Sequence, residues 1–336
     1  MAYKEADLAR LRTVPVAGRR NKVDRSLLAT PPGADRSFAA FLESLPDVLG
    51  ARDLRAVIAG VAGGARAGRG VVLLAGGHVI KTGLGPLINA WLARGVVTHL
   101  ALNGAAAIHD FELAAYGGTS EDVESGLADG TFGMAEETGA EMNAAIAAAA
   151  RADQGMGEGL ARSLGARGDL PGAEASVLLG ALRHDVPVTV HAAIGAEIIH
   201  QHPTADGAAL GATSHRDFRR LAGSLATLDQ GGAVLNWGSA VLLPEVFLKA
   251  LTIARNLDAG RPTHFLAADF DMQRHYRPRM NVVQRPTRAG GTGYLITGQH
   301  EVVIPMLVWG VLETLSATLS RPPSLALSPP SPARTP

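Results

Sequence analysis

The stretch Gly70-Val-Val-Leu-Leu-Ala75, followed by Gly76-Gly-His-Val-Ile-Lys-Thr-Gly-Leu-Gly-Pro86, decides the fold. Its aliphatic run has no polar interruption, which is typical of a strand buried on both faces of a sheet. The glycines that follow predict a tight turn, and Pro86 suits the first turn of a helix, where its missing N–H is not needed. The stretch therefore predicts a strand, a glycine-rich turn and a helix in succession.

The same alternation continues along the chain. Further strands are expected at 96–102, 186–191, 233–237, 263–268 and 293–297, and helices at 86–94, 121–127, 135–152, 173–184, 216–228, 244–256 and 302–319. Strands separated by helices imply parallel pairing through crossovers. We therefore expect an α/β fold with a doubly wound, mostly parallel, Rossmann-like sheet.

Composition excludes several classes of protein. The chain has 336 residues, no cysteine, 47% apolar residues, and 31 basic against 31 acidic residues. An apolar fraction this high does not suit a disordered chain, and the lack of cysteine excludes disulfides, thiolate zinc sites and iron–sulfur clusters. Zero net charge argues against a general nucleic-acid binder, which needs a basic excess. We expect a cytoplasmic protein without a nucleic-acid partner.

The chain divides into three parts. Residues 1–35 are polar and predict an N-terminal arm, residues 36–320 a single α/β domain, and residues 321–336, with six prolines, a disordered tail. The start is too polar for a signal peptide. The longest apolar run, 302–312, contains Pro305 and is shorter than the roughly 20 residues of a membrane span, so it predicts a buried helix and no membrane partner.

Open parallel sheets bind ligands at the carboxyl ends of their strands, so the residues that follow each strand are the candidates for a site. After the first strand, Gly76 and Gly77 would let a cofactor approach the backbone, next to His78, and Lys81 could neutralise an anion. The alternative is a tight turn with no ligand.

Three titratable groups follow the second strand. Asn103, Gly104 and Ala105 leave room for a flat cofactor, and His109 and Asp110 come next, with Glu112 close behind. Histidine is the side chain best suited to move protons near neutral pH, and a carboxylate can orient it. The alternative is a helix start whose acids complement the helix dipole.

The remaining strand ends are also polar. After the third strand come His191, Glu197, His200 and His202, which predict a polar substrate pocket, a metal site of no recognised spacing, or structural histidines. Gly238 follows the fourth strand at a point of close ligand approach. Asp269, in the fifth, is a carboxylate that could bind a ribose. The long loop beyond it carries Arg274, Arg277 and Arg285, which could grip an anion or lie in solvent.

The order of these motifs, across residues 71–315, resembles deoxyhypusine synthase and its superfamily. Gly76 to Gly83 lies where that family has its dinucleotide loop, and Asn103 to Asp110 where it has a glycine pair followed by acids. His184 to Val188 and Ala267 to Asp271 resemble two further family segments, and Gly293 to Glu313 corresponds to its closing strand and helix.

The resemblance implies a Rossmann-like sheet of the deoxyhypusine synthase type, bound NAD, a homotetramer and dehydrogenation of an amine as the first step. One departure changes the chemistry that can be expected. Leu243 occupies the position of the family's catalytic lysine, and a leucine cannot form an imine. Deoxyhypusine synthesis is therefore not expected.

We interpret the chain as an NAD-dependent enzyme, an oxidoreductase or a transferase, acting on a small amine or hydroxy metabolite. His109 or His191 would transfer the proton, beside Asp110, and Glu197 or Glu245 would hold the substrate. The first alternative is a metal-dependent hydrolase that uses His191, His200, His202 and Asp110. The second is a non-catalytic dinucleotide-binding protein.

Overall fold

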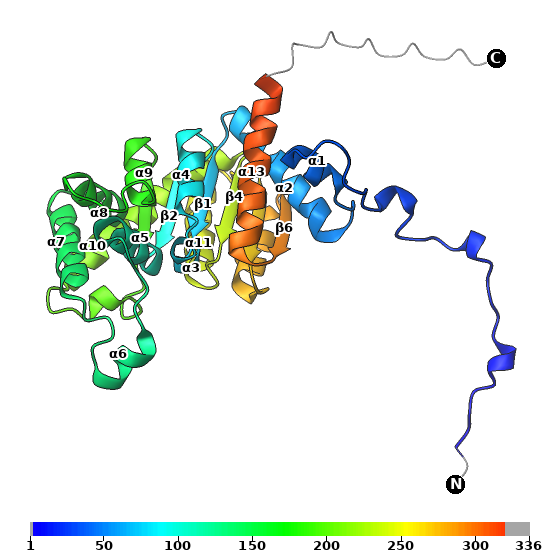
Figure 1. Cartoon of the computed structure of the whole chain (residues 1–336), viewed down its shortest axis with the longest axis horizontal. Helices are drawn as coiled ribbons and strands as arrows, with labels where there is room; N and C mark the ends of the chain where they lie inside the picture. The colour runs from blue at the N-terminus through cyan, green and yellow to red at the C-terminus, as the bar shows by residue number, and fades with distance from the viewer. Residues whose placement is uncertain (1–2, 320–336) are drawn as a thin grey trace.

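One sheet of six strands forms the centre of the molecule (Figure 1). The structure is a computed structural model, which describes residues 3–319. The strands lie in the order β3-β2-β1-β4-β5-β6, and every neighbouring pair is parallel. Their bounds are β1 Val71–Ala75, β2 His99–Asn103, β3 Val188–His191, β4 Ala233–Trp237, β5 Leu266–Asp271 and β6 Thr292–Thr297. The predicted doubly wound α/β sheet is confirmed, and the strand order reverses between β1 and β4.

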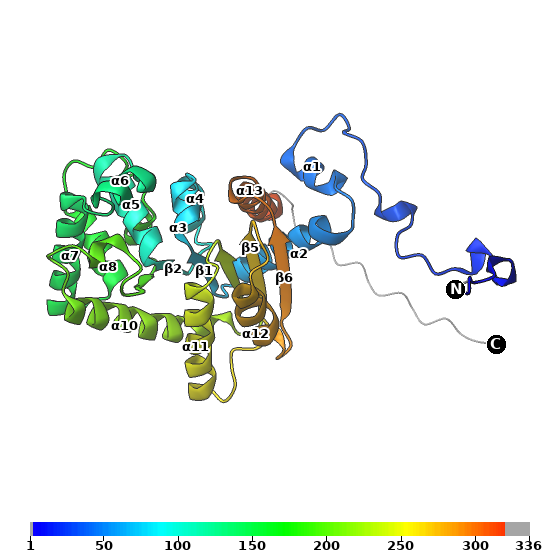
Figure 2. The same cartoon turned by 90° about the horizontal axis from the view of Figure 1, so that it is seen from below.

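Helices cover both faces of the sheet (Figure 2). Because side chains alternate along a strand, Leu73 packs with the helices of one face and Leu74 with those of the other. The first face carries α2 Leu49–Arg66, α4 Gly85–Ala93, α5 Gly104–Tyr116 and α13 His300–Leu319, and the second carries α10 Gly207–Ser224 and α11 Leu242–Leu257. Helices α7 Glu136–Arg151, α8 Met156–Gly165 and α9 Val177–Arg183 lie at the end of the molecule where β3 forms the edge of the sheet, and α9 packs against α4 and α8 (Figure 1).

Short elements complete the fold. The short α-helices are α1 Phe38–Ser44, α3 Gly77–Lys81, α6 Val123–Asp129 and α12 Arg285–Thr287. Three-residue or four-residue 3₁₀ turns lie at Leu8–Arg10, Val16–Gly18, Arg25–Leu27, Ile198–His200 (η4) and Leu225–Leu228, and a π-helical turn (η6) lies at Pro278–Gln284. The loop predicted after the fifth strand is therefore largely helical.

Several element boundaries differ from the prediction. The second strand begins at His99 rather than residue 96, because the backbone pairing with β1 starts only there. Helix α10 begins nine residues earlier than expected, at Gly207, because the Asp206 side chain caps it by accepting from the amides of Ala208 and Ala209. Apolar periodicity places a helix but not the cap that starts it.

The closing helix α13 is buried along one face only. Ile304, Leu307 and Val308 are buried in the core, but Trp309 is 55% exposed. Over His300–Ala317 this helix is long and apolar enough to cross a membrane by length and composition alone, a test that core helices of soluble proteins also pass. The expectation of a buried helix therefore holds for one face of α13 and not for the face that carries Val302 and Trp309.

The N-terminal arm leaves the body as exposed chain (Figure 1). All of residues 3–26 are exposed, and the first backbone hydrogen bond to the body is the one that the Asp47 amide donates to the carbonyl of Leu27. We refer to residues 3–26 as the distal arm. The predicted proline-rich tail, 321–336, lies outside the described residues.

Candidate functional site

The carboxyl ends of the strands gather the predicted site residues along one edge of the sheet. At the point where strand order reverses, the turns after β1 and β4 touch. The Gly76 amide donates to the carbonyl of Trp237, and a Cβ on Gly76 would lie 2.3 Å from the carbonyl oxygen of Gly238. Gly238 itself has a φ of +63°, which favours glycine. Close backbone contact therefore accounts for Gly76, and the positive φ accounts for Gly238.

A pocket of about 230 Å³ opens beside this edge, between α3, α5, the loop around α6 and η4. Polar groups reach it from all four segments: Lys81, His109, Glu112, Glu121 and Glu197 are among its lining residues. Ala105, Ile108, Val123, Phe132 and Ile198 supply its apolar wall. Four of the predicted site residues, namely Lys81, Ala105, His109 and Glu197, are thus brought together.

A chain of hydrogen bonds orients His109 in this pocket. The Thr119 hydroxyl donates to Glu112 Oε2, and Thr138 donates to Glu112 Oε1 at 3.0 Å. Because the Thr119 proton is committed to the carboxylate, Thr119 Oγ1 accepts from His109 Nδ1 at 2.8 Å. The neutral ring then carries its proton on Nδ1 and leaves a lone pair on Nε2, which is the arrangement of a general base.

The protonation of His109 suits that role. Burial is the main cause that lowers the pKa of His109, Lys81 lowers it further, and Glu112 opposes both. The imidazole is therefore neutral near pH 7 and ready to accept a proton. Thr119 and Thr138 were not singled out in the sequence, because hydroxyls in a loop and on a distant helix give no pattern that links them to His109.

Glu197 lies against the start of α5. Its carboxylate accepts from the Ala193 amide at 2.9 Å and lies 3.0 Å from His200 Nδ1. A Cβ on Gly104 would come within 2.4 Å of the Glu197 side chain, so the glycine makes room for the acid. Burial raises the pKa of Glu197, with the Ala193 hydrogen bond acting the other way.

Asp110 does not face the pocket. Its carboxylate is fully buried and accepts from the Ser176 hydroxyl at 2.7 Å and from the amides of Val177 at 2.7 Å and Leu178 at 3.0 Å. It thereby satisfies the first turn of α9. Burial raises the pKa of Asp110 to about 6. The geometry assigns it a structural role, in place of the catalytic one expected from its position beside His109.

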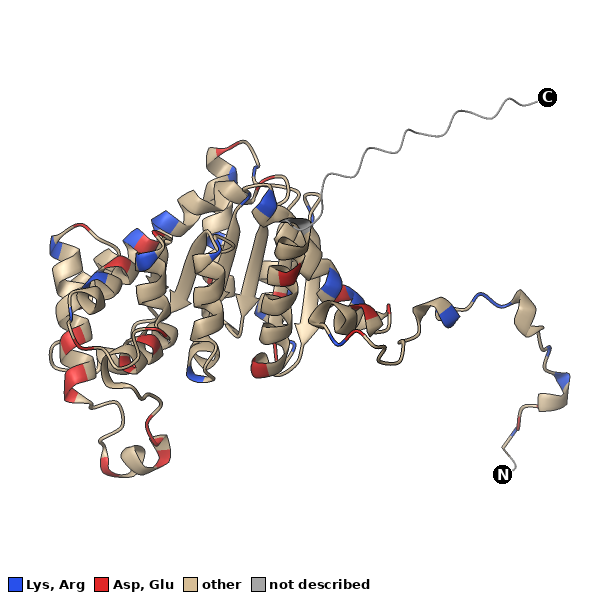
Figure 3. Cartoon of the chain, turned by 45° about the horizontal axis from the view of Figure 1, so that its top comes forward, with Lys and Arg blue, Asp and Glu red and all other residues tan. Residues whose placement is uncertain are grey.

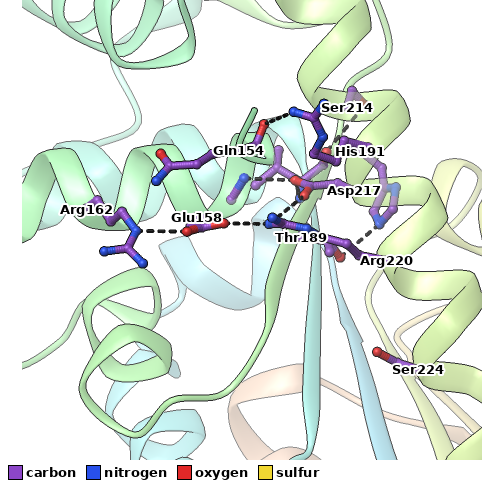
Figure 4. Close-up of polar contacts among 12 residues, drawn as sticks. Gln154, Glu158, Arg162, Thr189, His191, Ser214, Asp217, Arg220 and Ser224 are labelled. Atoms are coloured by element: carbon purple, nitrogen blue, oxygen red, sulfur yellow. Dashed lines mark hydrogen bonds and ion pairs between the residues drawn. The ribbon is translucent and has the colours of Figure 1, made fainter. Parts of the chain in front are cut away.

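His191 points away from the core that holds its neighbour Val190, to the face of β3 that α10 covers (Figure 4). Its Nε2 lies 3.1 Å from Thr189 Oγ1, which lies 3.0 Å from His99 Nε2, and His99 Nδ1 meets Ser224 at 2.8 Å. Burial lowers the pKa of His191 to about 4 and that of His99, helped by the charges of His191 and Arg220, to about 3. His191 is thus a neutral, buried, structural histidine rather than the proposed proton carrier.

Asp217 anchors the same region (Figure 4). Its Oδ2 accepts from the amides of Gly157 and Val190, both at 2.8 Å, and so joins α8 to β3. Burial raises the pKa of Asp217 to about 7. No sequence pattern marked this residue, because an aspartate within a helix is ordinarily a solvent-facing one.

Two residues predicted to bind the cofactor have partners within the protein. The Asn103 side chain caps α5 by accepting from the Ala106 amide at 2.9 Å. Asp269 is buried beside β4 and accepts from Asn236 at 2.7 Å, and burial raises its pKa to about 7. The expected reach of Asp269 to a ribose is therefore not seen. Gly77 packs against α5, where a Cβ would lie 3.0 Å from Ala105.

A histidine pair lies at the point where strand order reverses. His78 Nδ1 and His300 Nδ1 are 2.8 Å apart, and His300 Nε2 lies 3.2 Å from the carbonyl oxygen of Phe270. The carbonyl requires a proton on His300 Nε2, so His78 Nδ1 donates to His300, and the Nε2 atom of His78 keeps its lone pair. His300 was missed because it opens the last helix, far along the chain from His78.

The four residues predicted to bind a metal ion do not lie around one point. His202 bonds to Thr204, His200 to Glu197, and His191 and Asp110 lie in the separate buried networks described above. Within residues 3–319 no three His, Cys, Asp or Glu side chains are arranged to hold a metal ion. The structure therefore contradicts the ligand set of the predicted metal-dependent hydrolase.

The arginines after β5 bind protein groups. Arg274 donates to Thr297 at 3.1 Å, Arg277 to Glu245 at 3.2 Å and Arg285 to Asn281 at 2.7 Å. Glu245 also pairs with Lys249 and Asn281. Glu245 is not among the residues that line the pocket, so it is not placed to hold a substrate there.

A dinucleotide fits one part of this edge and not another. The strand order matches that of sheets that bind dinucleotides where the order reverses, and α3 begins there, after β1. Helices α5 and α13 begin at the same edge of the sheet, after β2 and β6. Lys81 adds a donor beside these helix ends. The Asp269 position does not fit a ribose, and the pocket of about 230 Å³ suits a small substrate rather than a whole dinucleotide.

No protein-family model matches the chain, and no curated protein matches it. Among solved structures, it is similar to the arginine dihydrolase ArgZ of cyanobacteria, with 14% identity and a TM-score of 0.47 over 79% of this chain and 33% of that one. It is also similar to a "conserved putative LOR/SDH protein" of Methanococcus maripaludis, with 14% identity and a TM-score of 0.47 over 85% of this chain and 74% of that one.

A third similar structure is a "putative deoxyhypusine synthase" of Entamoeba histolytica, with 10% identity and a TM-score of 0.49 over 83% of this chain and 94% of that one. The chain spans about a third of the length of ArgZ. At these identities the likeness concerns the fold, and a function has to rest on the residues of the site itself.

Proposed function

We propose that the chain is an NAD-dependent enzyme that oxidises a small amine, or the corresponding alcohol, in the pocket between α3, α5, α6 and η4. The observation that carries this proposal is the hydrogen-bond chain from Glu112 through Thr119 to His109, which leaves Nε2 of His109 as a base on the pocket wall. A group oriented in this way by a second and a third residue is the usual arrangement of an activated proton acceptor.

The charges of the pocket favour a cation. Three carboxylates, of Glu112, Glu121 and Glu197, face one ammonium group, of Lys81. Burial raises the pKa of Glu197, and an ammonium group bound beside it would favour the ionised form again. The carboxylates would therefore attract the ammonium group of a small amine. A neutral or anionic molecule of the same size would lack this attraction.

The residues divide the work as follows. Glu197 holds the ammonium or hydroxyl group of the substrate, and His109 takes the proton that this group releases on oxidation. Glu112 and Thr119 hold His109 in the tautomer that can accept this proton. NAD, when bound, supplies the hydride acceptor, and the start of α3 with His78 and Lys81 would hold it. Leu243, buried where the resembled family has its lysine, takes no part.

The test is a screen of small amines and alcohols with NAD, following the absorbance of reduced nicotinamide. Turnover is expected for the native chain and a loss of about a hundredfold or more for His109→Gln, since general-base catalysis contributes about 10²–10⁴. His184→Gln, at the exposed end of α9, is the matched control and should leave the rate unchanged. Equal rates in the His109 variant and the native chain would remove His109 from this role.

A non-catalytic dinucleotide-binding role is the second candidate. The fit of the β1/β4 edge to a dinucleotide supports it independently of the pocket. NAD binding without turnover of any amine or alcohol would favour it.

A further inference from the structure

A second pocket lies at the start of β3, at the opposite end of this strand from the candidate site. Its walls come from α8, α9, α10 and the first residues of β3, and we refer to it as the β3 pocket. Its volume of about 490 Å³ lies in the usual range of small-molecule sites. It shares no residue with the pocket of about 230 Å³ that holds His109, so each can bind a ligand of its own.

Two arginines bring positive charge to the β3 pocket. Arg162 Nε donates to Glu158 Oε1 at 2.9 Å, and Arg220 Nη1 lies 2.8 Å from Glu158 Oε2 (Figure 4). Within residues 3–319, neither terminal nitrogen of Arg162 has an acceptor, and Nη2 of Arg220 has none either. Glu158 thus balances one of the two charges and leaves several N–H groups open. A guanidinium group with free N–H groups can bind a carboxylate through two parallel hydrogen bonds.

The start of β3 adds a backbone donor. The Leu100 amide donates to the carbonyl of Pro187 at 2.9 Å, and this register turns the Val188 amide away from β2. The Val190 amide points the same way and donates to Asp217 at 2.8 Å. The Val188 amide has no acceptor in the described part of the chain, although Val188 is buried and lines the pocket. Because a buried amide is nearly always paired, an acceptor from outside the chain is expected there.

Apolar side chains supply much of the remaining lining: Ala161, Ala181, Leu182, Val186 and Pro187. Asp185 also lines the pocket, but it is exposed at the surface, where solvent and salt screen its charge. The β3 pocket therefore combines open hydrogen-bond donors with a surface on which a short hydrocarbon chain can pack.

The two pockets differ in charge. Residues 119–137, which form a wall of the pocket beside His109, hold six acidic residues and no basic one, and Figure 3 shows the segment around α6 with acidic residues only. In the β3 pocket, two guanidinium groups stand against two carboxylates, of which one is exposed. An anion is therefore repelled by the first pocket and can be held by the second.

We infer that the β3 pocket binds a small carboxylate with an apolar body. The carboxylate would accept from the open N–H groups of Arg162 and Arg220 and from the amide of Val188, and the hydrocarbon chain would pack on Leu182. This inference does not depend on the proposed function, because the two pockets are separate and either assignment can fail alone.

The test is a titration of the full chain with hexanoate, followed through the amide signal of Val188 and the Nε–H signals of the two arginines in ¹H–¹⁵N spectra. Hexanoate should shift these signals saturably. Its dissociation constant should lie about tenfold or more below those of 1-hexanol and hexylammonium at the same signals, since these controls have the same chain but no negative charge. Hexylammonium that binds beside His109 should leave Val188 unmoved.

Substitutions test the role of charge. Arg162→Gln should weaken hexanoate binding about tenfold, as expected for the loss of a charged donor, whereas Arg279→Gln, at an exposed position elsewhere, should not change it. Leu182 is 38% exposed and tolerates either charge. Leu182→Lys should bind hexanoate more tightly than Leu182→Glu, although both lose the same apolar side chain.

A Val188 signal that hexanoate leaves in place would overturn the inference. So would equal affinity for 1-hexanol, native affinity in Arg162→Gln, or a Leu182→Lys variant that binds hexanoate no more tightly than Leu182→Glu.

Discussion

Replacing Asp110 decides whether this residue holds the fold together or takes part in chemistry. Asp110→Ala removes the acceptor of the Ser176 hydroxyl and of the amides of Val177 and Leu178. The hydroxyl can turn towards another acceptor, but the two buried amides cannot. Each orphaned amide costs about 1–3 kcal/mol, which gives about 2–6 kcal/mol.

Removing the buried charge offsets part of this loss in the free energy of unfolding. Burial raises the pKa of Asp110 to about 6, which means that the carboxylate is itself held at a cost in the folded state. We therefore expect the lower part of the range, about 2–4 kcal/mol, as the loss in the free energy of unfolding measured by urea denaturation. Asp110→Asn keeps one acceptor oxygen and should lose less.

Asp206→Ala is the matched control, because Asp206 caps α10 from an exposed position. This substitution should lower the free energy of unfolding by only about 1 kcal/mol. If the free energy of unfolding of Asp110→Ala lies within about 1 kcal/mol of that of the native chain, the reasoning on its buried hydrogen bonds is wrong. If the variant is stable but loses turnover, Asp110 acts in the chemistry after all.

Three further changes test the account. The pKa of His99 is lower in the folded chain, about 3 against 6.5, so its contribution to stability is complete above pH 6.5 and is lost as the pH falls towards 3. The stability advantage of the native chain over His99→Gln should therefore shrink by about 1.4 kcal/mol per pH unit between pH 6 and 4 in urea titrations, and a constant difference would refute a neutral His99. Gly104→Ala should push Glu197 out of the pocket and weaken amine binding, as measured by calorimetry. Gly211→Ala, which has open space around it, should leave the affinity unchanged. Unchanged affinity in Gly104→Ala would remove Glu197 as the substrate anchor. Thr119→Val should shift His109 towards the tautomer protonated on Nε2, seen in its ¹⁵N spectrum, and lower turnover; an unchanged spectrum would exclude the hydrogen-bond chain.

The layered fold could be predicted from the sequence because its signals are local. An aliphatic run such as Val71 to Ala75 marks a strand buried on both faces wherever it occurs, and the alternation with helices implies parallel pairing. Boundaries were less accurate, since the start of α10 depends on the side chain of Asp206 rather than on apolar periodicity.

The site was predicted less completely, because position along a strand end does not fix the direction of a side chain. His109 and Asp110 are neighbours on α5, yet successive helical residues point about 100° apart, so one lines the pocket and the other caps α9. His191 shows the same limit on a strand, where alternate residues face opposite sides of the sheet. Thr119 and His300 join the site only through folding and carry no local motif.

The most direct test of the central claim is whether the chain binds NAD. Freshly purified full-length protein would be denatured, its supernatant analysed by mass spectrometry for nucleotide, and a second sample titrated with NAD by calorimetry. The account predicts co-purified NAD, or saturable binding of one NAD per chain that is weakened by Lys81→Ala and unaffected by Arg183→Glu. Absence of NAD from the supernatant, together with no heat on titration, would contradict it.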